Sequence, residues 1–379
     1  MNSLMRFRPI IFIAILSIAL YTNTLKNGFV LDDEDVIINS PLIKDFINVN
    51  KLFDRDYFYL SGEMSYRPVV TLSYFTDYKL SGLKPWGYHL TNVFLHAINS
   101  VLLYLFLSFI VRSSATKQAL LQHSRDVPLL ISILFTAHPI LTEAVNVPSY
   151  REDLLVFLFY IGALNLYLFI RSGTVSQSRL VTPTLYLLSY VMYLLALFSK
   201  EMAVTLPLMV YCYEWIYTDK RKNKNSILLN PYNAGYIGIT LVYTYIRFYY
   251  FHNPASLVEV YAPPWGFPER LLTIPWLLLN YMRLSIFPIS LSSDHIIDPV
   301  RSVSSFLFIA PVVIVSSLLS IGIKVRKQKK EIAFGMLYFL ITLLPVYNIV
   351  PIAMPMAERY LYLPIAGLAI IGGAILKFI

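Results

Sequence analysis

Residues 304–330 read SSFLFIAPVVIVSSLLSIGIKVRKQKK, and this stretch decides the fold class. Its residues 304–323 carry no charged side chain, and about 20 apolar residues are needed to cross the roughly 30 Å hydrocarbon core of a membrane. The Lys and Arg residues that follow meet no acidic residue until Glu331, as is typical of a cytoplasmic loop. The stretch therefore predicts a membrane span that ends in the cytoplasm.

The composition of the whole chain points the same way. Hydrophobic residues make up 57% of the 379 residues and charged residues only 14%, whereas soluble domains have roughly 45–50% and about 25%. So many apolar side chains exclude a disordered chain, and they make a soluble enzyme a poor fit. The 29 Tyr and 24 Phe suit aromatic belts at the two membrane interfaces.

Apolar segments of span length recur along the chain and predict an all-α polytopic membrane protein with about ten transmembrane helices. We place the spans at 9–25, 88–111, 127–146, 153–170, 184–199, 202–217, 231–251, 304–323, 331–350 and 358–376. A further segment, 269–287, is apolar but contains Pro275 and Arg283. We interpret it as a re-entrant or interfacial helix within the outer loop 252–303, and eleven spans is the alternative.

The basic loops orient the chain. The net charge is +9, and Lys and Arg gather at 112–125, 171–179, 220–224 and 324–330. Placing these loops and the N-terminus in the cytoplasm satisfies the positive-inside rule. A net basic chain could also bind nucleic acid, but retained loop cations explain the charge, so we expect no nucleic-acid partner. We expect residues 1–379 to form one membrane domain whose first extracytoplasmic loop is 26–87.

The long loop 26–87 has helical patterns of its own. Leu42, Phe46, Val49 and Phe53 recur at helical spacing, as do Val69, Leu72 and Phe75 after Pro68. Both patterns fit short helices lying on the membrane surface.

Ionisable residues near span ends fall mostly on the predicted outer side. They include Asp32 to Asp35, His89, His138, Glu143, Arg151 to Asp153, Lys200, Glu201, Arg247, Glu358 and Arg359. Charge at the membrane edge is costly and usually faces a cavity or a partner, so this set predicts one outward-facing polar cavity. Lys200-Glu201 and Glu358-Arg359 also fit structural ion pairs at span ends.

One helix face carries a polar stripe. His89, Asn92, His96 and Asn99 are spaced 3, 4 and 3 residues apart, which places them on one side of a helix. The stripe is compatible with a site inside the bundle and equally with ordinary interhelical hydrogen bonds.

Five strings together resemble a known family. They are NGFVLDDEDVIINS (27–40), YRPVVTLSYFTDYKLSGLKPWGYHLTNVFLHAINSVLLY (66–104), FTAHPILTEAVNVPSYREDLL (135–155), FSKEMAVTLP (198–207) and MAERYLYLP (356–364). In this order they resemble the membrane part of the transmembrane and tetratricopeptide-repeat O-mannosyltransferases, which are GT-C superfamily glycosyltransferases. This chain shows no such repeats, which puts mannose and a protein acceptor in question.

The resemblance implies a polyprenyl-phosphate-linked sugar as donor, most simply a mannose-like hexose, transferred to the hydroxyl of an acceptor protein or glycan outside the cytoplasm with inversion. It implies a catalytic base at Asp32 or Asp33. The candidates for binding the donor phosphate or sugar are Arg67, His89, His138, Arg151, Lys200, Glu201, Glu358 and Arg359. No cofactor is required, although Asp32, Asp33 and Asp35 suit Mg²⁺ or Mn²⁺ by ligand type.

Two other functions fit parts of the pattern. A secondary transporter also carries intramembrane charges, but it tends to have two related halves and a site near the midplane. A non-catalytic membrane scaffold is the third interpretation. We expect a multi-pass protein of a prokaryotic inner or plasma membrane, with the active site facing the periplasm or exterior.

Overall fold

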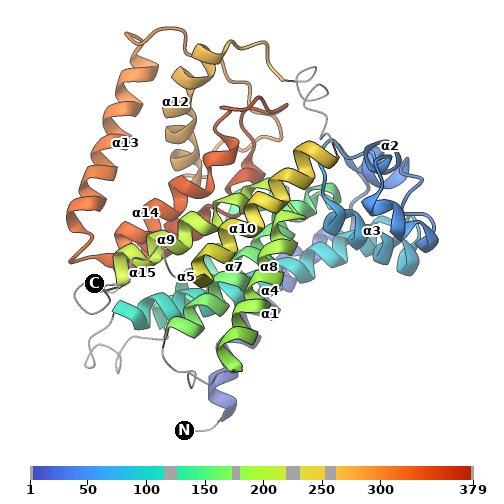
Figure 1. The fold of residues 1–379 in the computed structure, drawn as a ribbon, viewed down its shortest axis with the longest axis horizontal. Helices are drawn as coiled ribbons and strands as arrows, with labels where there is room; N and C mark the ends of the chain where they lie inside the picture. Colours follow the sequence, from blue (N-terminus) through green and yellow to red (C-terminus); the bar gives the residue numbers. More distant parts are fainter. Residues whose placement is uncertain (1–2, 115–125, 173–179, 219–230, 252–261, 377–379) are drawn as a thin grey trace.

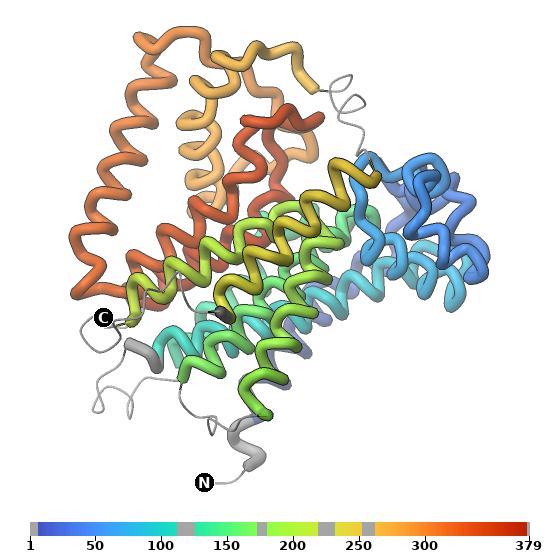
Figure 2. The backbone as a smooth tube through the Cα atoms, in the orientation of Figure 1, coloured from blue at the N-terminus to red at the C-terminus, as the bar shows by residue number. Residues whose placement is uncertain are grey.

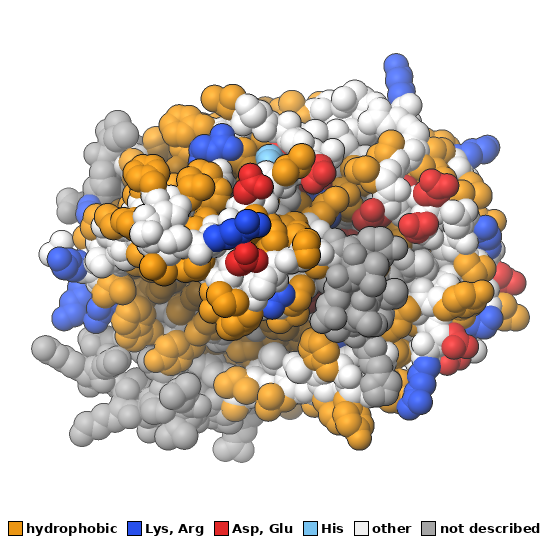
Figure 3. All heavy atoms as spheres, turned by 90° about the horizontal axis from the view of Figure 1, so that it is seen from above, with side chains coloured by type: hydrophobic (Ala, Val, Ile, Leu, Met, Phe, Trp, Pro, Cys, Tyr) orange, Lys and Arg blue, Asp and Glu red, His pale blue; other side chains and the backbone are white. Residues whose placement is uncertain are grey.

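A computed structural model describes residues 3–114, 126–172, 180–218, 231–251 and 262–376. In these residues the chain is helical and contains no strand (Figure 1). The basic segments 115–125, 173–179 and 220–224, and the start of loop 252–303, lie outside the described residues. Side chains on the surface are largely hydrophobic, with charged groups among them (Figure 3).

Each predicted span contains at least one helix. The helices are α1 (Ser3–Tyr21), α4 (Pro85–Ser114), α5 (Asp126–Thr136), α7 (Arg151–Arg171), α8 (Val181–Leu197), α9 (Leu206–Tyr217), α10 (Pro231–Tyr245), α13 (Phe306–Val325), α14 (Lys330–Thr342) and α15 (Ile365–Leu376). Four described stretches are long and apolar enough to cross a membrane: Phe7–Lys26, Pro85–Val111, Pro148–Arg171 and Phe306–Val325. The all-helical membrane fold is confirmed, and the count of ten crossings stays a prediction.

Several predicted spans are broken near one end, and proline marks the breaks. α5 ends at Thr136, and after a bend of 52° the chain continues through η4 (Pro139–Leu141) and α6 (Thr142–Asn146). Pro139 lacks the N–H that would continue the helical hydrogen bonds. Likewise η10 (Glu358–Leu361) precedes Pro364, and η6 (Glu201–Thr205) precedes Pro207. The spans at 127–146, 202–217 and 358–376 are therefore not single straight helices.

The polar stripe of α4 donates hydrogen bonds to backbone carbonyls of neighbouring segments. Asn92 Nδ2 donates to the carbonyl of Val147 (3.1 Å), and His96 Nε2 donates to the carbonyl of Thr136 (3.2 Å). Asn99 Nδ2 donates to a carbonyl of α7 (2.9 Å). A broken helix leaves backbone groups without partners, and a buried unpaired carbonyl is costly. Of the two interpretations, interhelical hydrogen bonding accounts for Asn92, His96 and Asn99.

The loop 26–87 folds as a small lobe at one end of the bundle, seen in blue in Figures 1 and 2. It consists of η2 (Glu34–Ile38), η3 (Phe46–Phe53), α2 (Tyr57–Ser61) and α3 (Pro68–Ser81). Its hydrophobic core also includes Tyr88, Leu155 and Phe251 from outside the loop. The predicted helix after Pro68 is confirmed, but its buried face is offset. Val70 and Tyr74 are fully buried, whereas Leu72 is 40% exposed.

The apolar segment 269–287 forms helix α12 (Phe267–Ile286), which packs against α13. After α12 the chain runs back to where that helix begins. The backbone N–H of Val300 donates to Thr273 Oγ1 (2.9 Å), and Arg301 Nε lies 3.2 Å from Glu269 Oε1. The interpretation of 269–287 as a re-entrant or interfacial helix stays a prediction.

Candidate active site

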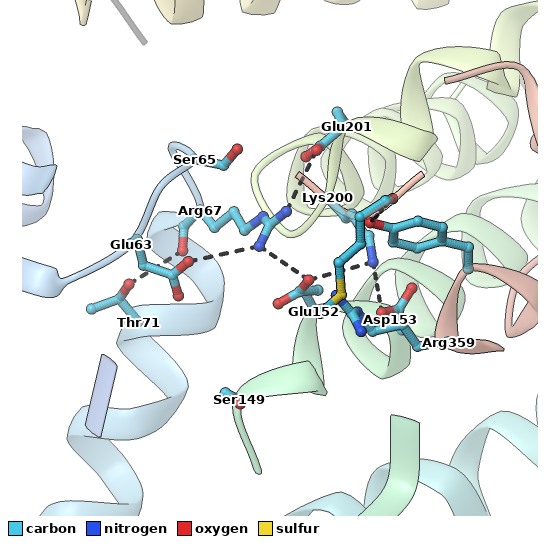
Figure 4. A network of polar contacts seen from close by, with 12 residues as sticks. Glu63, Ser65, Arg67, Thr71, Ser149, Glu152, Asp153, Lys200, Glu201 and Arg359 are labelled. Carbon is cyan, nitrogen blue, oxygen red and sulfur yellow. Dashed lines mark hydrogen bonds and ion pairs between the residues drawn. The ribbon is translucent and has the colours of Figure 1, made fainter. Parts of the chain in front are cut away.

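Charged side chains from four separate segments meet at the end of the bundle that carries the lobe (Figure 4). Arg67 lies at their centre: Nη1 is 3.0 Å from Glu152 Oε1 and 3.7 Å from Glu63 Oε2, and Nη2 is 3.4 Å from Glu201 Oε1. Pro68 disfavours helical geometry at the preceding residue. Arg67 accordingly leaves the line of α3 and reaches toward α7 and η6.

Two more cations complete this cluster. Lys200 Nζ lies 2.6 Å from Asp153 Oδ2 and 3.4 Å from Glu152 Oε1, and the side chain is only 2% exposed. Arg247 Nη1 lies 3.4 Å from Glu201 Oε2. We call the whole set the Arg67 network, and it consists of Glu63, Arg67, Glu152, Asp153, Lys200, Glu201 and Arg247.

The two candidate catalytic carboxylates point in different directions. Asp33 is fully buried: its Oδ2 accepts from the Val30 N–H (2.8 Å), and its Oδ1 accepts from the Ser149 N–H (2.7 Å). Asp32 is exposed, and among the described residues its carboxylate has no hydrogen bond or ion pair. Leu31, just before them, has a φ of 52°. That left-handed conformation is strained for a leucine.

Asp32 lies within electrostatic range of the Arg67 network. Desolvation by the surrounding protein raises the pKa of Asp32, and the negative charge of Glu152 raises it further, while Arg359 and Arg67 act in the opposite direction. Burial also raises the pKa of Asp33, and the N–H groups of Val30 and Ser149 oppose that shift. The charges of the network thus act on the pKa of Asp32, whereas the carboxylate of Asp33 is held by two backbone N–H groups.

Glu63 adds a further carboxyl group to the network. Burial raises the pKa of Glu63 to about 8, Arg67 opposes this shift, and Glu152 and Asp32 add to it. At neutral pH Glu63 is therefore mostly protonated.

Arg359 lies beside the network and is tied to α6. Its Nη1 donates to Glu143 Oε1 (2.7 Å), its backbone N–H donates to Glu143 Oε2 (2.8 Å), and its guanidinium lies 3.9 Å from the ring centroid of Tyr150. Among the described residues, Nη2 donates only to the sulfur of Met354 (3.3 Å). Nε is buried without a partner in the described part of the chain. Arg359 thus retains donors that no strong acceptor satisfies.

The chain matches no family model over its length, but it is similar to several curated proteins. It is 26% identical over 384 residues to a protein O-mannosyl-transferase of Caenorhabditis elegans, covering 98% of this chain and 51% of that protein. It is 27% identical over 406 residues to the protein O-mannosyl-transferase TMTC3 of Mus musculus, covering 96% of this chain and 42% of that protein.

Over nearly its whole length the chain is thus similar to proteins named protein O-mannosyl-transferase. The protein O-mannosyl-transferase TMTC1 of Homo sapiens is also similar, at 24% identity over 93% of this chain and 43% of its own length. The resemblance stated from the five strings is confirmed. The chain spans about half the length of these curated relatives, or somewhat less. No solved structure matches it.

Arg151, one of the candidate phosphate-binding residues, is engaged inside the protein. Its Nη2 lies 2.6 Å from Asp77 Oδ2, its Nε donates to Asn92 Oδ1 (2.8 Å), and its Nη1 donates to Ser73 Oγ (3.0 Å). Arg151 is also fully buried. All three of its nitrogens are occupied, so this arginine clamps α3, α4 and α7 together rather than offering its donors to a phosphate.

Three other candidates for binding the donor, His138, Glu358 and His89, are hydrogen-bonded to other parts of the chain or fully buried. His138 Nε2 donates to the carbonyl of Ser285 (3.1 Å). Glu358 Oε1 accepts from the Ser292 N–H (2.6 Å) and from His295 Nε2 (3.0 Å). His89 is fully buried near Asp33 without a well-formed hydrogen bond. His138 and Glu358 thus fasten α12 and the segment after it to the bundle.

The side chains of the acidic loop are not gathered around one point in the described structure. Within the described ranges, no group of three or more His, Cys, Asp or Glu side chains is arranged to hold a metal ion. Asp33 turns inward to the two backbone N–H groups, while Asp32 and Asp35 are exposed. The interpretation of Asp32, Asp33 and Asp35 as a joint ligand set for Mg²⁺ or Mn²⁺ stays a prediction.

Sequence reasoning missed two acids of this region, Glu63 and Asp77. Both lie in the lobe, where no span end marks them. Glu63 precedes Arg67 by four residues, but residues 62–67 are not helical, so the two side chains meet through the fold of the lobe and not through helical spacing. Asp77 and Ser73 lie four residues apart on α3, and both contact Arg151.

Proposed function

We propose that this chain is an integral-membrane glycosyltransferase that moves a hexose from a polyprenyl-phosphate donor to an acceptor hydroxyl. The homologues named protein O-mannosyl-transferase support the reaction class, and mannose and a protein hydroxyl are the simplest donor sugar and acceptor that their names suggest. The active site would face away from the cytoplasm, in a multi-pass protein of a cell membrane.

Asp32 is the proposed general base. A hydroxyl is a weak nucleophile at neutral pH, so a carboxylate within hydrogen-bond reach must take its proton as the new bond forms. The observation that carries the proposal is the contrast between the two carboxylates. Both oxygens of Asp33 accept hydrogen bonds from backbone N–H groups, whereas the carboxylate of Asp32 is exposed and lies within electrostatic range of Arg359 and Arg67. Asp33 would position the loop, and Asp32 would take the proton.

In the proposed step the acceptor oxygen attacks the anomeric carbon while its proton passes to Asp32. The bond from that carbon to the phosphate oxygen breaks, and the polyprenyl phosphate leaves with the bonding electrons. One such displacement inverts the anomeric centre. Preorganised cations in a poorly hydrated site stabilise developing negative charge on the leaving group.

Arg359 is the best-placed cation for that phosphate. The nitrogens of Arg151 are bonded to groups inside the protein, and Arg67 and Lys200 each contact more than one carboxylate. Arg359 pairs with a single acid, Glu143, and its buried Nε, like that of Arg67, has no partner among the described residues. Arginine can also bind a phosphate through two parallel hydrogen bonds. Arg67 and Lys200 would then contribute positive potential rather than direct contact.

The loop itself offers a matched test. Asp32→Asn and Asp35→Asn each remove one exposed carboxylate from the same loop. Membranes containing each variant are given radiolabelled mannose on undecaprenyl or dolichyl phosphate, and transfer to endogenous acceptors is measured. Asp32→Asn should lower the rate by about 10²–10⁴-fold, the usual contribution of a general base. Asp35→Asn should leave it unchanged.

Equal rates in wild type and Asp32→Asn would refute Asp32 as the base. If the wild type transfers no sugar from either carrier, while expressed and folded, the proposed donor is wrong. Uptake of a free solute by proteoliposomes would instead favour the transporter interpretation.

A further inference from the structure

Helix α2 ends at Gly62, which has a left-handed backbone conformation. Its φ is 74°, and its N–H donates to the carbonyl of Phe58 (3.2 Å), which closes the last turn of the helix. Glycine adopts this conformation without the steric cost that a Cβ adds. The end of α2 therefore favours glycine through its backbone alone.

Gly62 also meets the backbone of the acidic loop at 32–35. A Cβ at this position would lie 2.5 Å from the carbonyl oxygen of Asp35 and 2.9 Å from its carbonyl carbon. Ordinary contacts of a Cβ begin at 3.4 Å. Because these atoms belong to the backbone, no side chain can turn aside to make room, and one of the two segments would have to move.

The peptide group that Gly62 touches is hydrogen-bonded to Asp32. The carbonyl of Asp35 and the N–H of Val36 belong to one planar peptide group, and this N–H donates to the carbonyl of Asp32 (3.1 Å). The N–H of Asp35 donates to the same carbonyl (3.2 Å). A displacement of this peptide group is therefore passed directly to the backbone that carries the proposed base.

The residue after Gly62 belongs to the Arg67 network. Glu63 Oε2 lies 3.7 Å from Arg67 Nη1, and the Glu63 side chain is only 5% exposed. Two consecutive residues thus join two parts of the candidate site. Gly62 contacts the loop of Asp32, and Glu63 contacts the central cation of the network.

A second contact holds the end of α2 to the segment that follows the acidic loop. Ser40 Oγ donates to the carbonyl of Leu60 (3.1 Å), and the N–H of Leu42 donates to the same carbonyl (3.3 Å). Ser40 is buried. The loop and η2 are therefore attached to α2 on both sides of the contact with Gly62.

We propose that Gly62 is a positioning residue whose close contact with the acidic loop holds the Asp32 carboxylate in place beside the Arg67 network. The inference rests on the proposed function of Asp32 as the general base. A side chain at position 62 would open the contact by about 1 Å, and a shift of that size can lower a catalytic rate about 100-fold. The proposed phosphate ligand Arg359 is bonded to Glu143 and not to this loop, so binding of the donor should change little.

Gly62→Asn and Gly82→Asn form a matched pair. Asparagine enters left-handed conformations more readily than most residues, so it is a mild replacement at a positive φ. Gly82 also has a positive φ (61°), but a Cβ there would meet nothing within 4 Å. Gly62→Asn should lower kcat for sugar transfer by about 10–100-fold with an unchanged KM for the donor. Gly82→Asn should keep the kcat of the wild type.

Hydrogen–deuterium exchange of the purified full chain gives a measurement that does not depend on sugar transfer. The amide hydrogens of Asp35 and Val36 should exchange faster in Gly62→Asn than in the wild type, and at the wild-type rate in Gly82→Asn. Ser40→Ala removes the hydroxyl that donates to Leu60 and adds no atom. It should also speed this exchange, and it should lower kcat by up to about fivefold, the equivalent of one hydrogen bond.

A wild-type kcat in Gly62→Asn would overturn the proposal, and so would an equal loss of kcat in Gly82→Asn or unchanged exchange of the acidic loop in Gly62→Asn. If Gly62→Asn does not fold, wild-type kcat and exchange in Ser40→Ala would overturn it. Failure of the proposed function gives a different result. A wild-type rate in Asp32→Asn would refute Asp32 as the base, whereas faster exchange in Gly62→Asn would still show that Gly62 holds the loop.

Discussion

The two ends of α7 each carry a charged cluster, and the two clusters are built differently. At one end, Arg67 divides its contacts among Glu63, Glu152 and Glu201 at 3.7, 3.0 and 3.4 Å. At the other end, Glu214 receives Arg171 Nε at 2.7 Å and the hydroxyls of Tyr167 and Thr218 at 2.6 Å each. The helix rise of 1.5 Å per residue separates them by about 28 Å.

The difference indicates which cluster supports the fold and which can support chemistry. The Glu214 cluster is closed, because one acid has one base and two neutral donors, all at short distances. In the Arg67 network the charges are shared. Arg67 and Lys200 each face more than one acid, and Glu201 faces more than one cation. Such a network can redistribute when a charge is added or removed nearby. Asp32 and Arg359 lie beside it, and both retain unused bonding capacity.

The largest expected effect is on stability, from Lys200→Met. Lys200 is 2% exposed and pairs with Asp153, which is fully buried. Removing one partner of a buried ion pair costs about 3–5 kcal/mol, because the other charge is left uncompensated. We expect a loss of that size in denaturant titrations in detergent. Lys51→Met, on the exposed surface of the lobe, is the control and should change stability little.

The next effect is a pH dependence that belongs to the Arg67 network. The pKa of Glu63 is raised from its ordinary 4.5 to about 8, so between these values the folded protein holds a proton that the unfolded chain has released. Stability then falls as the pH rises from about 4.5 to about 8, with a total on the order of a few kcal/mol.

Glu63→Gln replaces the titrating carboxyl group with a neutral amide. The free energy of unfolding should then change less with pH across that range. Unfolding midpoints measured at pH 5, 6, 7 and 8 would show it. A variant curve that keeps the slope of the wild type would contradict the protonated state of Glu63.

The smallest effect belongs to the closed cluster. Thr218→Val removes one hydroxyl from Glu214, which keeps Arg171 and Tyr167. The loss of one such hydrogen bond costs about 1 kcal/mol. The rate of sugar transfer should be unchanged, because the cluster lies at the far end of α7. A large loss of transfer in this variant would show that the two ends are coupled.

The sequence predicted the fold where apolar length alone decides it. Every predicted span contains a helix, since a stretch such as 304–323 has no competing structure in a membrane. It did not predict where spans break, although His138-Pro139 carried the signal. A break becomes stable only when a partner such as Asn92 satisfies the freed carbonyls, and that partner comes from another helix.

The site was predictable in its location and less so in its roles. Arg67, Lys200 and Glu201 do meet, and Arg359 lies beside them. The opposite orientations of Asp32 and Asp33 could not be predicted, because they follow from the backbone at Leu31 and the N–H of Ser149. Arg151 looked the same as Arg359 in sequence, yet the buried Asp77 holds it inside.

The most direct test of the central claim is the acid limb of the pH–rate profile in Glu152→Gln. If Asp32 is the base and lies beside the Arg67 network, transfer is lost as the pH falls through its raised pKa. Removing the negative charge of Glu152 lowers that pKa, so the acid limb should move to lower pH. Glu214→Gln, at the other end of α7, should leave the limb in place. An acid limb that stays fixed in Glu152→Gln would contradict the account.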